Sequence, residues 1–144
     1  MQPDGAPIGL QLAVTSKAVS RAFNGALAQA GGSLPVWLVL SSLKQAHRRT
    51  QLELAQAVGI EGPTLTRHLD GLERAGLVER RRDPVDRRAV RVDLTGEGER
   101  LHGRLLQAVI AFNRRLTAGL SEQELNGLRR TLARLEENVA RDGS

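Results

Sequence analysis

Two short helical patterns separated by a glycine turn constrain the fold more than any other feature of this chain. A capping box from Thr50 to Glu53 begins the first pattern, because its hydroxyl and its carboxylate can each satisfy a backbone N–H at a helix start. Gly59 supplies the turn, and Gly62 and Pro63 form a good cap and first-turn pair for the second pattern. This spacing of small residues and helices predicts a helix-turn-helix.

A β-hairpin is predicted directly after the second helix. Residues 77–82 and 89–94 form its two arms, and apolar and charged side chains alternate from Val90 to Leu94, as they do in a half-buried strand. Residues 83–86 form the turn between the arms. A hairpin that follows a helix-turn-helix in this way is called a wing.

Helical periodicity predicts four further helices, at residues 8–30, 33–47, 95–118 and from 121 onwards. We therefore expect one domain that is mainly α with a small β wing. A winged helix-turn-helix core would occupy residues 33–99, and dimerisation helices would flank it at 8–32 and 100–141. The apolar stripes of the terminal helices are not obviously covered by a compact core, which predicts a homodimer. Packing of the last helix onto the preceding one is the alternative.

The basic residues are concentrated in the middle of the chain. The formal net charge is +5, and residues 44–91 hold 11 basic against 7 acidic side chains and so account for +4 of it. Of the 21 basic residues 19 are Arg, whose planar guanidinium suits phosphates and base edges. A charge run is in many proteins only a solvated face. Here it flanks the turn of the predicted wing, which favours nucleic acid as the partner.

Several classes of protein are excluded by what the sequence lacks. It contains no Cys, which excludes disulfide scaffolds, thiolate zinc sites, cysteine nucleophiles and thiol redox switches. The 3 His lie on separate predicted elements, and neither paired carboxylates nor a phosphate-binding loop occur, so we expect no enzyme, no metal and no cofactor. The longest uncharged stretch is interrupted by Gly31, Gly32 and Pro35. We therefore expect no membrane span and a cytoplasmic protein.

Five motifs occur in a fixed order, namely Ser33-Leu-Pro-Val-Trp, Gln51-Leu-Glu-Leu-Ala-Gln-Ala-Val-Gly-Ile-Glu, Pro63-Thr-Leu-Thr-Arg-His-Leu-Asp-Gly-Leu-Glu-Arg-Ala-Gly-Leu-Val, Asp83-Pro-Val-Asp-Arg-Arg and Leu94-Thr-Gly-Glu-Gly. With them the chain resembles the MarR family of winged-helix transcriptional regulators, and within it the SlyA-like branch. The flanking helices match the family in pattern and length only. The resemblance implies a homodimer that binds pseudo-palindromic double-stranded DNA and regulates transcription, typically as a repressor.

The second helix of the helix-turn-helix is the predicted recognition helix. Its leucines fall on one face and must be core, which places Pro63, Thr64 and Arg67 on the opposite face and His68 on the flank. Arg67 could pair with guanine O6 and N7 in the major groove, and the resemblance implies a base-reading arginine at this position. We expect phosphate or shape contacts from Thr64 and His68.

The wing arginines are the second set of candidates. The resemblance implies that Arg88 enters the minor groove, with Asp86 aligned to hold its guanidinium and Arg87 as an alternative or second contact. The strand arginines at 80–82 alternate between two faces, so not all of them can face DNA. We expect phosphate contacts from four further arginines, namely Arg48, Arg49, Arg80 and Arg82.

The resemblance also implies a small aromatic or phenolic effector, because many members of the family bind such ligands between the dimerisation and DNA-binding parts. An effector of this kind acts by preferring one spacing of the two recognition helices. Its pocket would be lined by Lys17, Arg21, Phe23, Trp37 and His47, although their spacing does not show it. Trp37 is more often simple core and Arg21 more often surface.

Each functional interpretation has a structural alternative. Arg67 could pair with Asp70 or Glu73 on its own helix, and Asp86 and Arg88 could serve only to stabilise the hairpin. At the level of the whole chain, the alternative is a winged-helix module that binds proteins rather than DNA. A module of that kind does not need a basic wing tip, so the position of the charge favours DNA.

Overall fold

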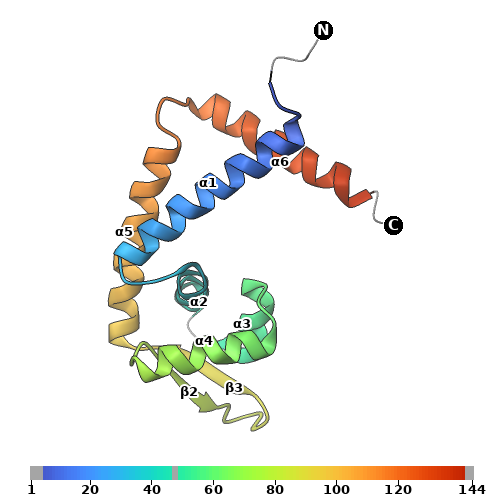
Figure 1. Cartoon of the computed structure of the whole chain (residues 1–144). Helices are drawn as coiled ribbons and strands as arrows, with labels where there is room; N and C mark the ends of the chain where they lie inside the picture. The colour runs from blue at the N-terminus through green and yellow to red at the C-terminus, as the bar shows by residue number, and fades with distance from the viewer. Residues whose placement is uncertain (1–4, 47–48, 142–144) are drawn as a thin grey trace. The chain divides into compact units, whose positions relative to one another are not determined.

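The structure is a computed structural model that describes residues 5–46 and 49–141, and for Arg49 the backbone only. Two compact units make up the chain, Met1–Ile110 and Ala111–Ser144, and we describe each by itself. The described part contains these elements (Figure 1): α1 (Ile8–Gln29), α2 (Leu34–Gln45), β1 (Arg49–Thr50), α3 (Gln51–Val58), α4 (Gly62–Arg74), β2 (Val78–Arg82), β3 (Val90–Leu94), α5 (Gly96–Leu116) and α6 (Glu122–Arg141).

The expected fold class, mainly α with a small β wing, is confirmed. The helix-turn-helix is α3 and α4, and the wing is the antiparallel hairpin of β2 and β3. A two-residue strand, β1, also pairs with β3, so that the sheet order is β1-β3-β2. The sequence analysis missed β1, because two residues are too few to show an alternating pattern.

Side-chain caps fix most of the helix starts. Ser121 and Glu124 form a reciprocal capping box, with each backbone N–H donating to the other residue's side chain at 3.1 Å. At α3 the Thr50 hydroxyl accepts from the Glu53 N–H at 3.1 Å, but the Glu53 carboxylate accepts from that hydroxyl rather than from a backbone N–H. The predicted cap of α4 is wrong by one residue, since Glu61 is the N-cap and makes no side-chain cap bond.

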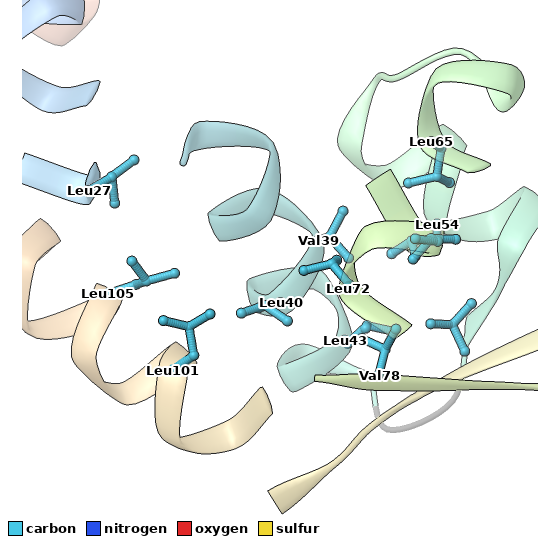
Figure 2. Close-up of a cluster of buried hydrophobic side chains, with 12 residues drawn as sticks. Leu27, Val39, Leu40, Leu43, Leu54, Leu65, Leu72, Val78, Leu101 and Leu105 are labelled. Atoms are coloured by element: carbon cyan, nitrogen blue, oxygen red, sulfur yellow. The ribbon is translucent and has the colours of Figure 1, made fainter. Parts of the chain in front are cut away.

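The core of the first unit orients the recognition helix. Leu65, Leu69 and Leu72 of α4 are buried together with residues of α2, α3 and the hairpin, and Figure 2 shows this cluster. Burying a leucine side chain stabilises a fold by about 1.5–3 kcal/mol. Three of them on one face therefore hold α4 firmly with its opposite face outward.

The base of the wing is joined closely to the start of α5. The Thr95 hydroxyl donates to the Gly76 carbonyl at 2.6 Å and accepts from the Gly98 N–H at 3.1 Å. Gly98 lies so near the hairpin that a Cβ there would collide with the carbonyl oxygen of Leu77 and approach Leu94 Cδ2 to 2.9 Å. Only glycine permits this close approach.

Asp83 organises the turn at the tip of the wing. Its Oδ1 accepts from the backbone N–H groups of Val85 at 2.8 Å and Asp86 at 3.1 Å, and its Oδ2 lies 3.0 Å from Nε of Arg91. These backbone hydrogen bonds and, to a smaller extent, the nearby Arg91 guanidinium lower the pKa of Asp83. The carboxylate therefore stabilises the turn in its ionised form.

We predict that Gly98→Ala destabilises the protein by about 1–3 kcal/mol, because the new methyl group must displace the backbone at Leu77. Urea denaturation at a fixed protein concentration measures the effect. The matched control is Gly103→Ala in the same helix, where an added Cβ meets nothing within 4 Å. This control should instead gain about 0.5–1 kcal/mol from helix propensity. Equal effects of the two substitutions would contradict the close approach.

We also predict that the wing turn loosens in acid. Because the folded-state pKa of Asp83 is lowered, its stabilisation is fully present above the unfolded value of about 3.9 and is lost as the pH falls through the folded value. NMR titration should show the Asp83 carboxyl and the Val85 and Asp86 amides changing together, with a midpoint below 3.9. In Asp83→Asn the amides should lose this titration. A carboxyl midpoint at or above the ordinary value would contradict the assignment.

Candidate nucleic-acid interface

The outer face of α4 presents Arg67, with the exposed Arg74 two turns further along the helix. Arg67 lies opposite the buried leucines and is exposed, and Pro63 beside it is exposed as well, whereas Thr64 and His68 are half-buried. Within the described residues, the Arg67 guanidinium makes no hydrogen bond and no ion pair. An exposed and unpaired guanidinium has all five of its N–H donors available to a ligand.

The acidic neighbours of Arg67 are engaged by another arginine. Nη2 of Arg80, on β2, lies 2.5 Å from Oδ1 of Asp70 and 3.0 Å from Oε1 of Glu73. The backbone N–H of Arg80 also donates to Oε2 of Glu73 at 2.9 Å. The alternative in which Arg67 pairs with Asp70 or Glu73 is therefore not the arrangement in the structure.

Charge states follow from these contacts. The backbone N–H of Arg80, followed by its guanidinium, lowers the pKa of Glu73. Partial burial by itself lowers the pKa of Arg80, but the hydrogen bonds to Asp70 and Glu73 outweigh it and the pKa is raised. Glu73 is thus held as an anion and Arg80 as a cation.

The tip of the wing presents a second exposed cation. The Arg88 side chain is 95% exposed, and its Nε lies 3.7 Å from Oδ1 of Asp86. The backbone N–H of Arg88 donates to the same oxygen at 3.1 Å. Asp86 therefore holds the backbone of Arg88 more closely than its guanidinium. Arg87 is exposed beside it.

The recognition helix and the wing flank one groove. Its volume is about 680 Å³, and its lining includes Gly62 and Thr66 of α4, Gln51 of α3, and Asp86 and Arg88 of the wing. Figure 1 shows the hairpin lying alongside α4, and the pairs made by Arg80 join the two. Arg88 lines this groove directly, and Arg67 follows Thr66, which lines it from α4.

The arginines predicted to contact phosphates lie in different surroundings. Arg82 is exposed at the end of β2, whereas Arg80 points to the acidic side chains of α4. Arg48 lies outside the described residues, and only the backbone of Arg49 is described, where it pairs with Val92.

The effector pocket remains a prediction, and its described candidate residues lie on α1 and α2. Lys17 and Arg21 are exposed on α1, Phe23 packs against the core, and His47 lies outside the described residues. The Trp37 ring stacks on His102, with the ring centroids 5.3 Å apart and the planes 10° from parallel. None of the four described candidates lines the groove between α4 and the wing.

Sequence reasoning missed three residues that shape this surface. Gln51 donates to the Thr66 hydroxyl at 2.6 Å and so ties α3 to α4. Asp83 and its partner Arg91 hold the wing turn, as described above. A signal for Asp83 was present, because an aspartate at the start of a turn commonly accepts from the N–H two residues later.

No single helix in the described part of the chain is long and apolar enough to cross a membrane, and α1 with α2 meets that test only as a pair bent by 71°.

Comparison with known proteins adds to this geometry. Residues 33–90 match the model of the MarR family. The chain is 30% identical to CouR, a transcriptional repressor bound to a 23-mer DNA duplex, with a TM-score of 0.81 over 90% of this chain and 92% of that one. It is 29% identical to a mutant MarR from E. coli complexed with operator DNA, with a TM-score of 0.79 over 90% and 93% of the two chains.

A probable transcriptional regulator from Pseudomonas aeruginosa is also similar, at 26% identity and a TM-score of 0.76 over 90% of this chain and 99% of that one. The matched region covers α2 to the start of β3 and so includes the helix-turn-helix and most of the wing. The likenesses to solved structures extend over nearly the whole chain. By fold, by sequence and by the geometry of its helix and wing, the chain belongs to the MarR family of winged-helix transcription regulators.

Proposed function

We propose that the protein is a sequence-specific regulator of transcription that binds double-stranded DNA as a homodimer on a pseudo-palindromic operator. The observation that carries the proposal is the exposed Arg67, which has no partner among the described residues and lies on the helix that borders the groove lined by Arg88. MarR of E. coli and CouR are both described in complex with DNA, which supports the same function here. The placement in the SlyA-like branch remains a prediction of the motifs.

In this proposal α4 enters the major groove. Arg67 donates to O6 and N7 of a guanine, a bidentate contact that distinguishes base pairs. Pro63 allows the helix to approach closely, while Thr64 and His68 contact phosphates or sense the shape of the groove.

The wing reaches the adjacent minor groove. Arg88 enters it where the groove is narrow and its negative potential is strong, and Arg87 is the second contact. Asp86 fixes the backbone from which Arg88 extends. Arg82, Arg48 and Arg49 are proposed to contact phosphates.

Two copies of the chain are needed because a single recognition helix provides little affinity. Helix-turn-helix dimers bind half-sites about 34–36 Å apart. Each unit of this chain exposes apolar side chains at helical spacing that a second copy would bury, including Leu10 and Val14 on α1 and Leu128 and Leu132 on α6. We assign dimerisation to these helices, and the cytoplasm, with its nucleoid, as the location. The aromatic or phenolic effector remains a prediction.

The second candidate function is a protein-binding winged helix. Its interface would not need the excess of basic residues in the segment from 44 to 91. A titration of binding against salt separates the two candidates. DNA binding should weaken with a slope of about −0.9 per neutralised phosphate in a double-logarithmic plot. A flat response, or the absence of DNA binding, would favour the protein-binding module.

We predict that Arg67→Ala lowers affinity for the cognate operator by about 1–3 kcal/mol and relaxes specificity at one base pair in each half-site. The measurement is a gel-shift titration of cognate and scrambled duplexes at fixed salt, with the operator taken from selection among random duplexes. Arg104→Ala, an exposed arginine on α5, is the matched control and should leave the ratio of the two affinities unchanged. Equal weakening on both duplexes would remove the base-reading role from Arg67.

We predict that Arg88→Ala weakens binding chiefly to operators with A·T-rich flanks, because the narrow groove provides the attraction. Operators that share half-sites but differ in A·T or G·C flanks provide the comparison. Arg87→Ala on the same operators decides which of the two arginines enters the groove. An effect of Arg88→Ala that does not depend on the flanking sequence would indicate a phosphate contact instead.

A further inference from the structure

Helix α4 carries two carboxylates on the C-terminal side of Arg67, the arginine proposed to read a base. Asp70 follows Arg67 by three residues, and side chains at this spacing are neighbours on a helix surface. Glu73 follows Asp70 by the same interval. An ionised carboxylate beside Arg67 competes with a guanine for its donors, so Asp70 interferes with DNA recognition when it has no other partner.

Arg80 engages both carboxylates with one side chain. Its Nη2 lies 2.5 Å from Asp70 Oδ1, and its Nε and Nη2 donate to Glu73 Oε1 at 3.2 and 3.0 Å. The Arg80 side chain is only 20% exposed, whereas the Asp70 and Glu73 side chains are 46% and 41% exposed. The guanidinium is thus turned away from solvent and towards α4.

The register of the hairpin explains why Arg80 takes this position. Arg80 pairs with Val92 and Arg82 with Val90, while Arg81 lies opposite Arg91. Val92 is fully buried, and Val78, two residues before Arg80, is buried as well. Arg80 therefore extends from the core side of β2, where α4 packs, and its neighbour Arg81 extends to the other side.

We propose that Arg80 is a positioning residue for DNA recognition and not a phosphate contact. By pairing with Asp70 and Glu73 it keeps Arg67 unpaired and fixes the angle between α4 and the wing. Its Nε and Nη2 already donate to the carboxylates and its side chain is only 20% exposed, so that only Nη1 is left for a phosphate. The inference rests on the proposed function, because it concerns the availability of the arginine that contacts the base.

Arginine suits this role better than lysine. Its planar group spreads five donors over a fixed fork, so that one side chain reaches Asp70 through Nη2 and Glu73 through Nε and Nη2. When this fork is absent, Asp70 is free to pair with Arg67 across one helical turn. The consequence is a loss of base discrimination without the loss of any residue that touches DNA.

The test is Arg80→Met, which keeps the aliphatic stem and removes the donors. We expect the ratio of cognate to scrambled affinity to fall about tenfold, which corresponds to one lost bidentate base contact. In Arg80→Met/Asp70→Asn the ratio should recover, because the amide no longer attracts Arg67. Arg81→Met is the matched control: its exposed partner Glu79 lies on the same strand, and the ratio should not change.

A phosphate contact by Arg80 gives a different result. Arg80→Met would then weaken cognate and scrambled duplexes equally, reduce the salt slope by about 0.9, and gain nothing from Asp70→Asn. That outcome would overturn the proposal. The proposed function fails separately, because in that case the unaltered protein itself does not discriminate between duplexes.

A second variant keeps the proposal testable when Arg80→Met does not fold, as judged by circular dichroism. Asp70→Asn/Glu73→Gln leaves Arg80 in place and removes both anions. The proposal expects full base discrimination in this variant, because Arg67 has no carboxylate to meet on its helix. A loss of base discrimination in this variant, in which Arg67 has no carboxylate to pair with on its helix, would contradict the assignment.

Discussion

The burial of three leucines on α4 is the constraint on which the rest of the structure depends. Because Leu65, Leu69 and Leu72 occupy one face of the helix, the opposite face must lie in solvent. A helix of 13 residues held by three such side chains has no freedom to rotate about its axis without exposing a leucine. The direction of Arg67 is thus a result of apolar packing, and no polar interaction of its own is needed to set it.

Ion pairs then act on charged side chains whose positions are already set by apolar packing. The surface formed by α4 and the wing carries acidic as well as basic side chains. The contacts among these side chains decide which of the basic ones remain unpaired. Arg80 pairs with both carboxylates of α4, and Asp83 pairs with the turn amides and Arg91, whereas Arg67 and Arg88 are exposed outside these pairs. Individual exposed ion pairs contribute little to stability. Their importance here lies in deciding which donors remain available to a ligand.

Much of this architecture was predictable from the sequence, because it depends on local patterns. The leucine spacing located the buried face of α4, and glycines marked its ends. The partners of Arg80 were not predictable, since strand alternation assigns a face but not the helix that covers it. The same holds for Trp37, whose stacking on His102 joins residues distant in sequence. The strand β1 was too short to leave a pattern.

The junction at Gly98 has a mechanical consequence. Thr95 binds the carbonyl of Gly76 on one side and the amide of Gly98 on the other, and the glycine leaves no gap between helix and hairpin. The first turn of α5 cannot tilt against the base of the wing without breaking these bonds. A rotation or tilt of that end of α5 would therefore move the hairpin with it.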